Sequence, residues 1–103
     1  MFPVLAVHRV KANLEVYTGQ QYKGDFHVDW LHPTMDMPTK NMMTAIYYVN
    51  SNNGYTEFED GTKVESVRNR IVTFPSSMKH RGVSQTDTRT RMVINFNWFV
   101  SDI

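Results

Sequence analysis

Residues 7–18 read Val-His-Arg-Val-Lys-Ala-Asn-Leu-Glu-Val-Tyr-Thr, and this stretch decides the class of fold. In this stretch the apolar residues Val10, Ala12, Leu14 and Val16 alternate with polar or charged ones. An alternation with period two is typical of a β-strand that has one face against a core. Gly19 follows and ends the predicted strand.

Similar short runs recur along the rest of the chain. Further strands are predicted at residues 26–30, 44–50, 55–59, 63–67, 70–74, 78–85 and 89–99. The Asp60-Gly61 pair predicts a hairpin, and residues 31–43, which contain two prolines, are interpreted as a loop. About eight strands at this spacing, with no helical period, predict an all-β sandwich, barrel or jelly roll.

The chain is short and lacks cysteine. Its 103 residues are enough for one domain, taken as residues 1–103, and too few for two. Without cysteine, disulfides, thiolate metal sites and a cysteine nucleophile are excluded. The net charge of +1 gives no overall attraction to nucleic acid or to a membrane surface. No apolar run approaches the roughly 20 residues that span a bilayer, and the first residues make a poor signal peptide, so we expect a cytoplasmic protein.

His27 and Asp29 are the first candidates for a chemical role. Residues two apart on a strand point to the same face, so the predicted strand 26–30 would present an imidazole and a carboxylate side by side. A third ligand would complete a set of two histidines and one carboxylate, which suits non-haem Fe(II) with open coordination positions. The candidates for it are His8, His32 and His80. His80 is favoured because it lies in a predicted strand.

Five segments, taken together and in order, carry a resemblance to a known family. They are Tyr-x-Gly at 17–19 leading into His-x-Asp at 27–29, the aromatic strand 44–50, Asn-Gly-Tyr-Thr-Glu-Phe at 53–58, Phe-Pro at 74–75 leading to His80, and the strand 91–97 that begins with an arginine. This order of motifs resembles the prolyl-hydroxylase-like Fe(II)/2-oxoglutarate dioxygenases over about residues 7–99. The closest branch is the compact one that is often encoded by phages, so the chain is expected to be of viral or phage origin.

The resemblance implies a double-stranded β-helix, which is the cupin-like jelly roll, and a metal site in it. In this family the residues at the positions of His27, Asp29 and His80 ligate Fe(II). The arginine at the position of Arg91 pairs with the distal carboxylate of the cosubstrate 2-oxoglutarate. A guanidinium suits that role because its planar fork matches a carboxylate.

The resemblance also implies a wall for the cosubstrate pocket. Tyr48 would donate its hydroxyl to the distal carboxylate, Tyr17 would lie near the metal end of the cosubstrate, and Asn95 would line the pocket. Two alternatives stay open: Tyr22 in place of Tyr17, and Arg89 in place of Arg91.

The implied activity is an oxygenase reaction. Fe(II), 2-oxoglutarate and O2 would together give succinate, CO2 and a hydroxylated prime substrate, which the residues do not identify. The alternatives are a cupin-type metalloprotein and a non-catalytic jelly-roll module for binding or structure. Asp29, where a cupin has a second histidine, and Arg91 favour the oxygenase.

The predicted sheet has one apolar face without a cover. If Tyr48 and Arg91 point inward, then the opposite faces of their strands and of strand 7–18 point outward, with Val10, Ala12, Leu14, Val16, Ala45, Tyr47, Val49, Met92, Ile94, Phe96 and Trp98. Such a face is larger than a soluble monomer usually exposes. Larger relatives cover it with N-terminal helices, which are expected to be lacking here. We therefore expect a homodimer, another covering subunit or a longer protein, unless a register error of one residue exchanges the faces.

Overall fold

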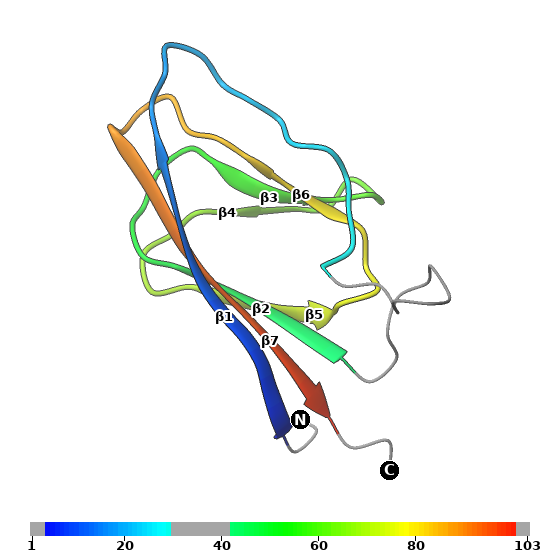
Figure 1. The fold of residues 1–103 in the computed structure, drawn as a ribbon. Helices are drawn as coiled ribbons and strands as arrows, with labels where there is room; N and C mark the ends of the chain where they lie inside the picture. The colour runs from blue at the N-terminus through cyan, green and yellow to red at the C-terminus, as the bar shows by residue number, and fades with distance from the viewer. Residues whose placement is uncertain (1–3, 30–41, 101–103) are drawn as a thin grey trace.

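The computed structural model describes residues 4–29 and 42–100. In this part of the chain there are seven strands: β1 (Val4–Val16), β2 (Met42–Tyr48), β3 (Tyr55–Phe58), β4 (Lys63–Glu65), β5 (Ile71–Pro75), β6 (His80–Val83) and β7 (Thr90–Val100). They form a four-stranded sheet in the order β1-β7-β2-β5 and a three-stranded sheet in the order β4-β3-β6. Every strand pair is antiparallel, and the two sheets lie as separate layers (Figure 1). The described residues include no helix long and apolar enough to cross a membrane.

The all-β prediction is confirmed, with two corrections. The predicted strand 26–30 is not a strand, because the segment before Asp29 pairs with β6 only through isolated bridges at Lys23 and His27. Two separate bridges make no continuous ladder, so seven strands rather than about eight are found in the described residues. Met42 and Met43 belong to β2 instead of the predicted loop. Residues 30–41, the rest of that loop with His32, lie outside the described residues.

The predicted hairpin at Asp60-Gly61 is confirmed. It joins β3 to β4, whose residues pair from Tyr55 opposite Glu65 to Glu57 opposite Lys63. Gly61 has a φ of 94°, in the left-handed region that side chains disfavour. The Asp60 carboxylate accepts a hydrogen bond from the backbone N–H of Thr62 at 2.9 Å, which closes the turn.

The core lies between the two sheets. Its buried members are Ile46, Tyr48, Phe58, Phe74 and Val93. The rings of Phe58 on β3 and Phe74 on β5 meet edge to face with centroids 4.9 Å apart, so the small sheet is packed directly on the large one. This contact sets the separation of the layers next to His80, whose ring centroid lies 4.8 Å from that of Phe74.

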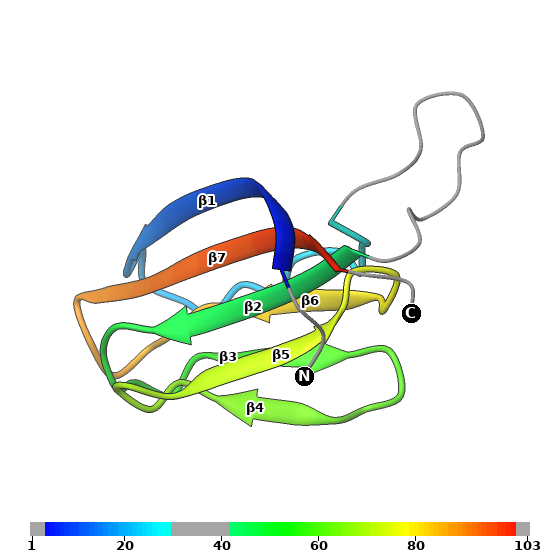
Figure 2. The ribbon, with the colours of Figure 1, turned by 90° about the horizontal axis from the view of Figure 1, so that it is seen from below.

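The register of the large sheet confirms the predicted faces. Figure 2 shows β1, β7, β2 and β5 side by side. Tyr48 and Arg91 are buried on the inner face, at 0% and 3% exposure. Residues that are paired across neighbouring strands have their side chains on the same face of the sheet. The opposite face, called the outer apolar face, therefore consists of Val10, Ala12 and Leu14 of β1, Met92, Ile94 and Phe96 of β7, Ala45 and Tyr47 of β2, and Ile71 of β5. At its two edges this face is open, since Leu14 and Ile71 are each 57% exposed.

Candidate metal centre

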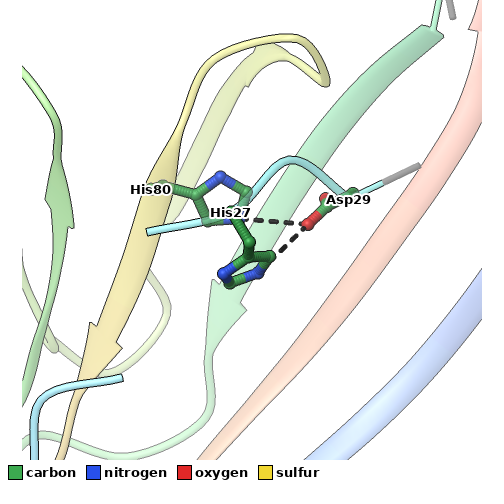
Figure 3. Close-up of side chains that lie close together, drawn as sticks. All are labelled: His27, Asp29 and His80. Carbon is green, nitrogen blue, oxygen red and sulfur yellow. Dashed lines mark ion pairs between the residues drawn. The ribbon is translucent and has the colours of Figure 1, made fainter. Parts of the chain in front are cut away.

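Three side chains from two separate parts of the chain meet at one end of the space between the sheets (Figure 3). His80 begins β6, whereas His27 and Asp29 come from the extended segment beside it. The Asp29 Oδ1 atom lies 3.0 Å from His80 Nε2 and 3.7 Å from His27 Nε2. One ligand atom from each residue lies within 4.8 Å of the others, so the three could hold a single metal ion.

Backbone hydrogen bonds fix this meeting. The N–H of His27 donates to the His80 carbonyl and the N–H of His80 donates to the His27 carbonyl, both at 3.0 Å. A reciprocal pair of this kind places the two residues directly opposite each other, with their side chains on the same face. The two imidazole rings consequently lie with centroids 4.6 Å apart. A single β-bridge thus replaces the strand predicted at 26–30 and still brings the ligands together.

Each imidazole is oriented by a carbonyl two residues before it. His27 Nδ1 lies 3.0 Å from the Asp25 carbonyl oxygen, and His80 Nδ1 lies 2.9 Å from that of Met78. A carbonyl only accepts, so the proton of each neutral ring is on Nδ1. In a neutral ring Nε2 then has the lone pair that a metal would take, as is usual for metal-binding histidines. In the metal-free protein, His80 Nε2 instead carries a proton and donates to Asp29 Oδ1.

The Asp29 carboxylate is held by residues of the large sheet. Its Oδ2 atom accepts hydrogen bonds from Thr44 Oγ1 at 2.6 Å and from Asn97 Nδ2 at 2.9 Å. Thr44 has only one hydroxyl proton, which it gives to Asp29, so it accepts from Asn97 at 2.9 Å and from Ser76 Oγ at 2.7 Å. Because Oδ2 is used in this way, Oδ1 is left as the metal-facing oxygen.

These contacts also set the charges of the cluster. Burial alone would raise the pKa of Asp29, but hydrogen bonds from His80, Thr44 and Asn97 outweigh it and hold this pKa well below its usual range. Burial alone would lower the pKa of His80, but the hydrogen bonds to Asp29 and to the Met78 carbonyl raise it. Asp29 is thus an anion at neutral pH, as a metal ligand must be.

The donor set fits a first-row divalent metal with open positions. Two imidazole nitrogens and one carboxylate oxygen are the ligands of the facial triad that binds non-haem Fe(II). Adjacent ligands of an octahedral ion with bonds near 2.1 Å are about 3.0 Å apart. The distance from Asp29 Oδ1 to His80 Nε2 has this value, and the 3.7 Å to His27 Nε2 is longer. His80 and Asp29 have side chains only 4% exposed, whereas His27 is 53% exposed, so the cluster opens to solvent on the side of His27.

A cavity of about 370 Å³ runs from this cluster into the space between the sheets. His27 and His80 line one part of it, and Arg91, Glu15 and Asn95 also line it. A volume of this size is within the range of small-molecule sites. The cavity therefore joins a candidate metal centre to a buried cation.

Arg91 is the buried cation of this cavity. Its Nε donates to Ser66 Oγ at 3.3 Å and its Nη1 to Glu15 Oε1 at 3.4 Å, both of which are long hydrogen bonds. A Cβ atom on Gly54 would lie 2.7 Å from Arg91 Cδ, so this glycine leaves the space in which the arginine lies. Among the described residues, the guanidinium uses two of its five N–H groups in hydrogen bonds, so the group can still receive a carboxylate.

The other predicted pocket residues are placed as follows. The Tyr48 hydroxyl is buried and lies 2.7 Å from Thr56 Oγ1, which lines the cavity, and its own ring is not part of the lining. Burial raises the pKa of Tyr48, so its hydroxyl keeps its proton. Asn95 lines the cavity, and its Oδ1 is buried without a hydrogen-bond partner in the described part of the chain. Such an oxygen is suited to a donor that a bound molecule would bring.

One predicted pocket residue, Tyr17, and the two alternatives Tyr22 and Arg89 lie outside the cavity. Tyr17 follows the end of β1 and is 43% exposed, and Tyr22 is 54% exposed. Neither tyrosine lines the cavity, and nor does Arg89, which precedes β7 and is exposed. The structure thus brings His27, His80, Arg91 and Asn95 to one cavity, with Asp29 beside the two histidines, and leaves Tyr17 outside it.

Some residues of the site were missed by sequence reasoning. Thr44, Ser76 and Asn97 around Asp29, and Glu15 and Gly54 around Arg91, are all ordinary residues within strand or turn patterns. The sequence did contain one sign of them, because residues an even number of positions apart on a strand share a face. Thr44 thus shares a face with Tyr48, and Asn97 shares a face with Arg91. This spacing within each strand could not show that Thr44 and Asn97 are paired across the two strands.

The fold and the site define a class of protein: a jelly-roll domain with a buried arginine in its cavity and, beside it, two histidines and one carboxylate that could hold a metal ion. The model of the 2OG-Fe(II) oxygenase superfamily matches residues 12–99, which is most of the chain. The chain belongs to this superfamily. Its resemblance to the prolyl-hydroxylase-like enzymes, inferred from motifs, is thereby confirmed at the level of the family. No curated protein sequence matches the chain.

Solved structures confirm the double-stranded β-helix. A cupin protein from Bacteroides fragilis has a TM-score of 0.63 at 11% identity, over 91% of this chain and 67% of the cupin chain. A prolyl-4-hydroxylase from Pseudomonas putida has a TM-score of 0.59 at 21% identity, over 93% of this chain and 55% of the hydroxylase chain. At these identities the likeness is one of fold. The chain spans only about half the length of the prolyl-4-hydroxylase.

Proposed function

We propose that this chain is an Fe(II)- and 2-oxoglutarate-dependent hydroxylase. The observation that supports this most is one cavity that is lined both by the histidines of the candidate metal centre and by the buried cation Arg91. When bound, Fe(II) supplies O2 activation, with 2-oxoglutarate oxidised to succinate and CO2 as a C–H bond of the prime substrate becomes C–OH. The buried arginine favours this function over a cupin metal centre or a structural module, because a guanidinium in such a cavity is suited to a carboxylate ligand.

In this proposal each residue of the chain has a limited task. His27, Asp29 and His80 hold the metal, and their backbone and side-chain hydrogen bonds orient them before it binds. Arg91 binds the distal carboxylate of 2-oxoglutarate and so orients the cosubstrate with its oxo-acid end toward the metal. Thr56, backed by the Tyr48 hydroxyl, lines the cavity on the inner face of the small sheet.

The test is anaerobic addition of Fe(II) and then 2-oxoglutarate to the protein. Chelation of the metal by the oxo acid is expected to give a weak visible charge-transfer band, followed by succinate on admission of O2. His80→Ala should lose metal and band, whereas the matched variant His8→Ala, in β1 outside the cavity, should keep both. Absence of the band in the wild type, or an unchanged band in His80→Ala, would refute the proposal.

A second comparison separates the two ends of the cavity. Arg91→Ala removes the cation that receives the distal carboxylate and leaves all three metal ligands in place. We expect it to weaken 2-oxoglutarate binding by at least tenfold, because a buried carboxylate loses a charge-assisted pair, with little change in metal binding. Isothermal titration with Co(II), and then with 2-oxoglutarate, gives both affinities. A larger loss of metal binding than of cosubstrate binding would contradict the role of Arg91.

We also propose that a second copy of the chain covers the outer apolar face. The face carries no charged side chain at the positions named above, so it offers nothing to a charged partner and is complementary to itself. The strands are about 4.8 Å apart with about 3.4 Å per residue, so four strands of 13, 11, 7 and 5 residues make a face of roughly 600 Å². Two such faces would bury about 1,200 Å², the lower limit for a stable interface.

Light scattering tests this association. A dimer in the wild type that dissociates in Ile71→Lys, a change at an exposed position of the outer face away from the cavity, would support it. A soluble monomer that binds no apolar dye would exclude it, and a monomer that binds such a dye would exclude the second copy as the cover.

A further inference from the structure

Glu15 lies at an unexpected place in the cavity. It stands on β1 directly opposite Arg91 on β7, so the register of the two strands, rather than their sequence neighbourhood, makes them a pair. Its Oε1 accepts from Arg91 Nη1 at 3.4 Å. Glu15 also lines the same cavity as Arg91 and the two histidines. A carboxylate of the protein itself therefore lies where a carboxylate ligand would approach the guanidinium.

The two partners differ greatly in exposure. The Arg91 side chain is 3% exposed, whereas that of Glu15 is 41% exposed. Arg91 is also restrained by its bond to Ser66 and by the close approach of Gly54, so it has little room to move. Glu15 is on an edge strand with solvent beside it and can leave the pair without losing its hydration. The glutamate is thus the partner that can give way.

Competition follows from the charges. A buried cation without a counter-ion is costly, so the pair with Glu15 stabilises the pocket while it contains no ligand. An incoming carboxylate must replace Glu15 or lie beside it, and two like charges so close together repel. Each arrangement lowers the affinity for a carboxylate ligand below what Arg91 alone would give.

We propose that Glu15 is the resting counter-ion of Arg91 and sets the cosubstrate affinity by competing with the distal carboxylate of 2-oxoglutarate. This inference rests on the proposed function. Glu15 touches Arg91 and is not a catalytic residue; it is a specificity-determining residue that acts through the arginine. It acts only on ligands that carry the distal carboxylate, and this selectivity distinguishes it from a merely structural ion pair.

The experiment compares Glu15→Gln with the wild type and with Glu59→Gln. Glutamine keeps the size of the side chain and removes the charge. Glu59 forms an exposed ion pair with Lys79 at 3.8 Å and is outside the cavity, so its variant controls for the loss of one negative charge. The affinity for 2-oxoglutarate is measured anaerobically on the Fe(II) protein from the charge-transfer band, and the affinity for 2-oxopentanoate, which lacks the distal carboxylate, is measured in the same way.

We expect Glu15→Gln to bind 2-oxoglutarate about fivefold more tightly, a value typical of a partly exposed ion pair, with 2-oxopentanoate unchanged. Its melting temperature without ligand should fall, while the increase in melting temperature on adding 2-oxoglutarate should grow. Glu15→Asp, which keeps the charge but draws it back from Arg91, should give a smaller gain in affinity and serves if Glu15→Gln does not fold.

Two results would overturn the inference. One is an affinity for 2-oxoglutarate in Glu15→Gln that equals that of Glu59→Gln or is weaker. The other is an equal gain for 2-oxoglutarate and 2-oxopentanoate, since that would reflect a general change of the cavity. If no variant and no wild-type sample gives a band, the proposed function itself is refuted, and the inference with it.

Discussion

Replacing Thr44 with valine removes one hydroxyl from the network around Asp29 and changes the side-chain volume very little. Thr44 is 0% exposed and donates to Asp29 Oδ2 at 2.6 Å. The substitution also leaves the donors of Ser76 and Asn97 without this acceptor. A hydrogen bond to a charged group contributes about 1.5–3 kcal/mol. Loss of an outer-shell partner of a metal ligand usually lowers metal affinity by about 10–100-fold, or roughly 1.4–2.7 kcal/mol.

A matched control is provided by a second buried threonine. Thr56 is 1% exposed, and its hydroxyl lies 2.7 Å from that of Tyr48, so Thr56→Val makes the same chemical change on the small sheet. We expect Thr44→Val to weaken Co(II) binding by about 10–100-fold. We expect Thr56→Val to leave it within about twofold, since it removes no partner of a metal ligand.

The assay is anaerobic calorimetric titration with Co(II), accompanied by urea unfolding of each metal-free variant. Both variants should lose unfolding free energy, so stability alone cannot explain a difference in metal affinity. Equal metal affinities for Thr44→Val and the wild type would refute the assignment of Thr44 as an orienting partner of Asp29. An equal loss in both variants would show that metal affinity follows stability rather than this contact.

Three further predictions concern other parts of the molecule. Gly54→Ala should weaken 2-oxoglutarate binding by at least tenfold with metal binding unchanged, because its Cβ would lie 2.7 Å from Arg91 Cδ and displace the guanidinium; unchanged cosubstrate titrations would contradict this. Metal affinity should increase as pH rises through the raised pKa of His80, because the metal replaces its proton. Over the same pH range the unfolding free energy of the metal-free protein should fall. A group whose pKa is raised on folding stabilises the fold at pH values below its ordinary pKa, near 6.5 for His80, and this effect is lost above the raised pKa. Metal affinity and unfolding free energy that change in the same direction with pH would contradict this prediction. Phe58→Ala should cost about 3–5 kcal/mol of unfolding free energy in urea, because the ring is 4% exposed between the sheets; a loss below about 1 kcal/mol would place it outside the core.

The strands and the ligand types were accessible from the sequence because they depend on local patterns. Side-chain alternation in residues 7–18 and 89–99 gives the strand and both of its faces, since the period of two is a property of the backbone itself. The five motif segments between residues 17 and 97, taken together and in order, were sufficient to identify the family, which the family match confirms. The roles of these residues stay predictions.

Other features depended on strand pairing, which no local pattern contains. The sequence did not show that Thr44 and Asn97, which are 53 residues apart, would meet at Asp29, nor that Glu15 and Arg91, 76 residues apart, would face each other. It also placed Tyr17 in the pocket, although β1 ends at Val16 and the tyrosine is left exposed. Each of these results depends on which residues of two distant segments come into register.

The sequence by itself determined an all-β chain and supplied two histidines and one aspartate as candidate metal ligands, because alternation and residue chemistry act over a few neighbouring positions. Only the tertiary structure decided how the ligands are held. His27 reaches His80 through a single β-bridge rather than a strand, and Asp29 is oriented by the opposite sheet. The physical reason is that hydrogen-bond register and the burial of a charge are set by contacts between remote segments, and these exist only after the two sheets have packed together.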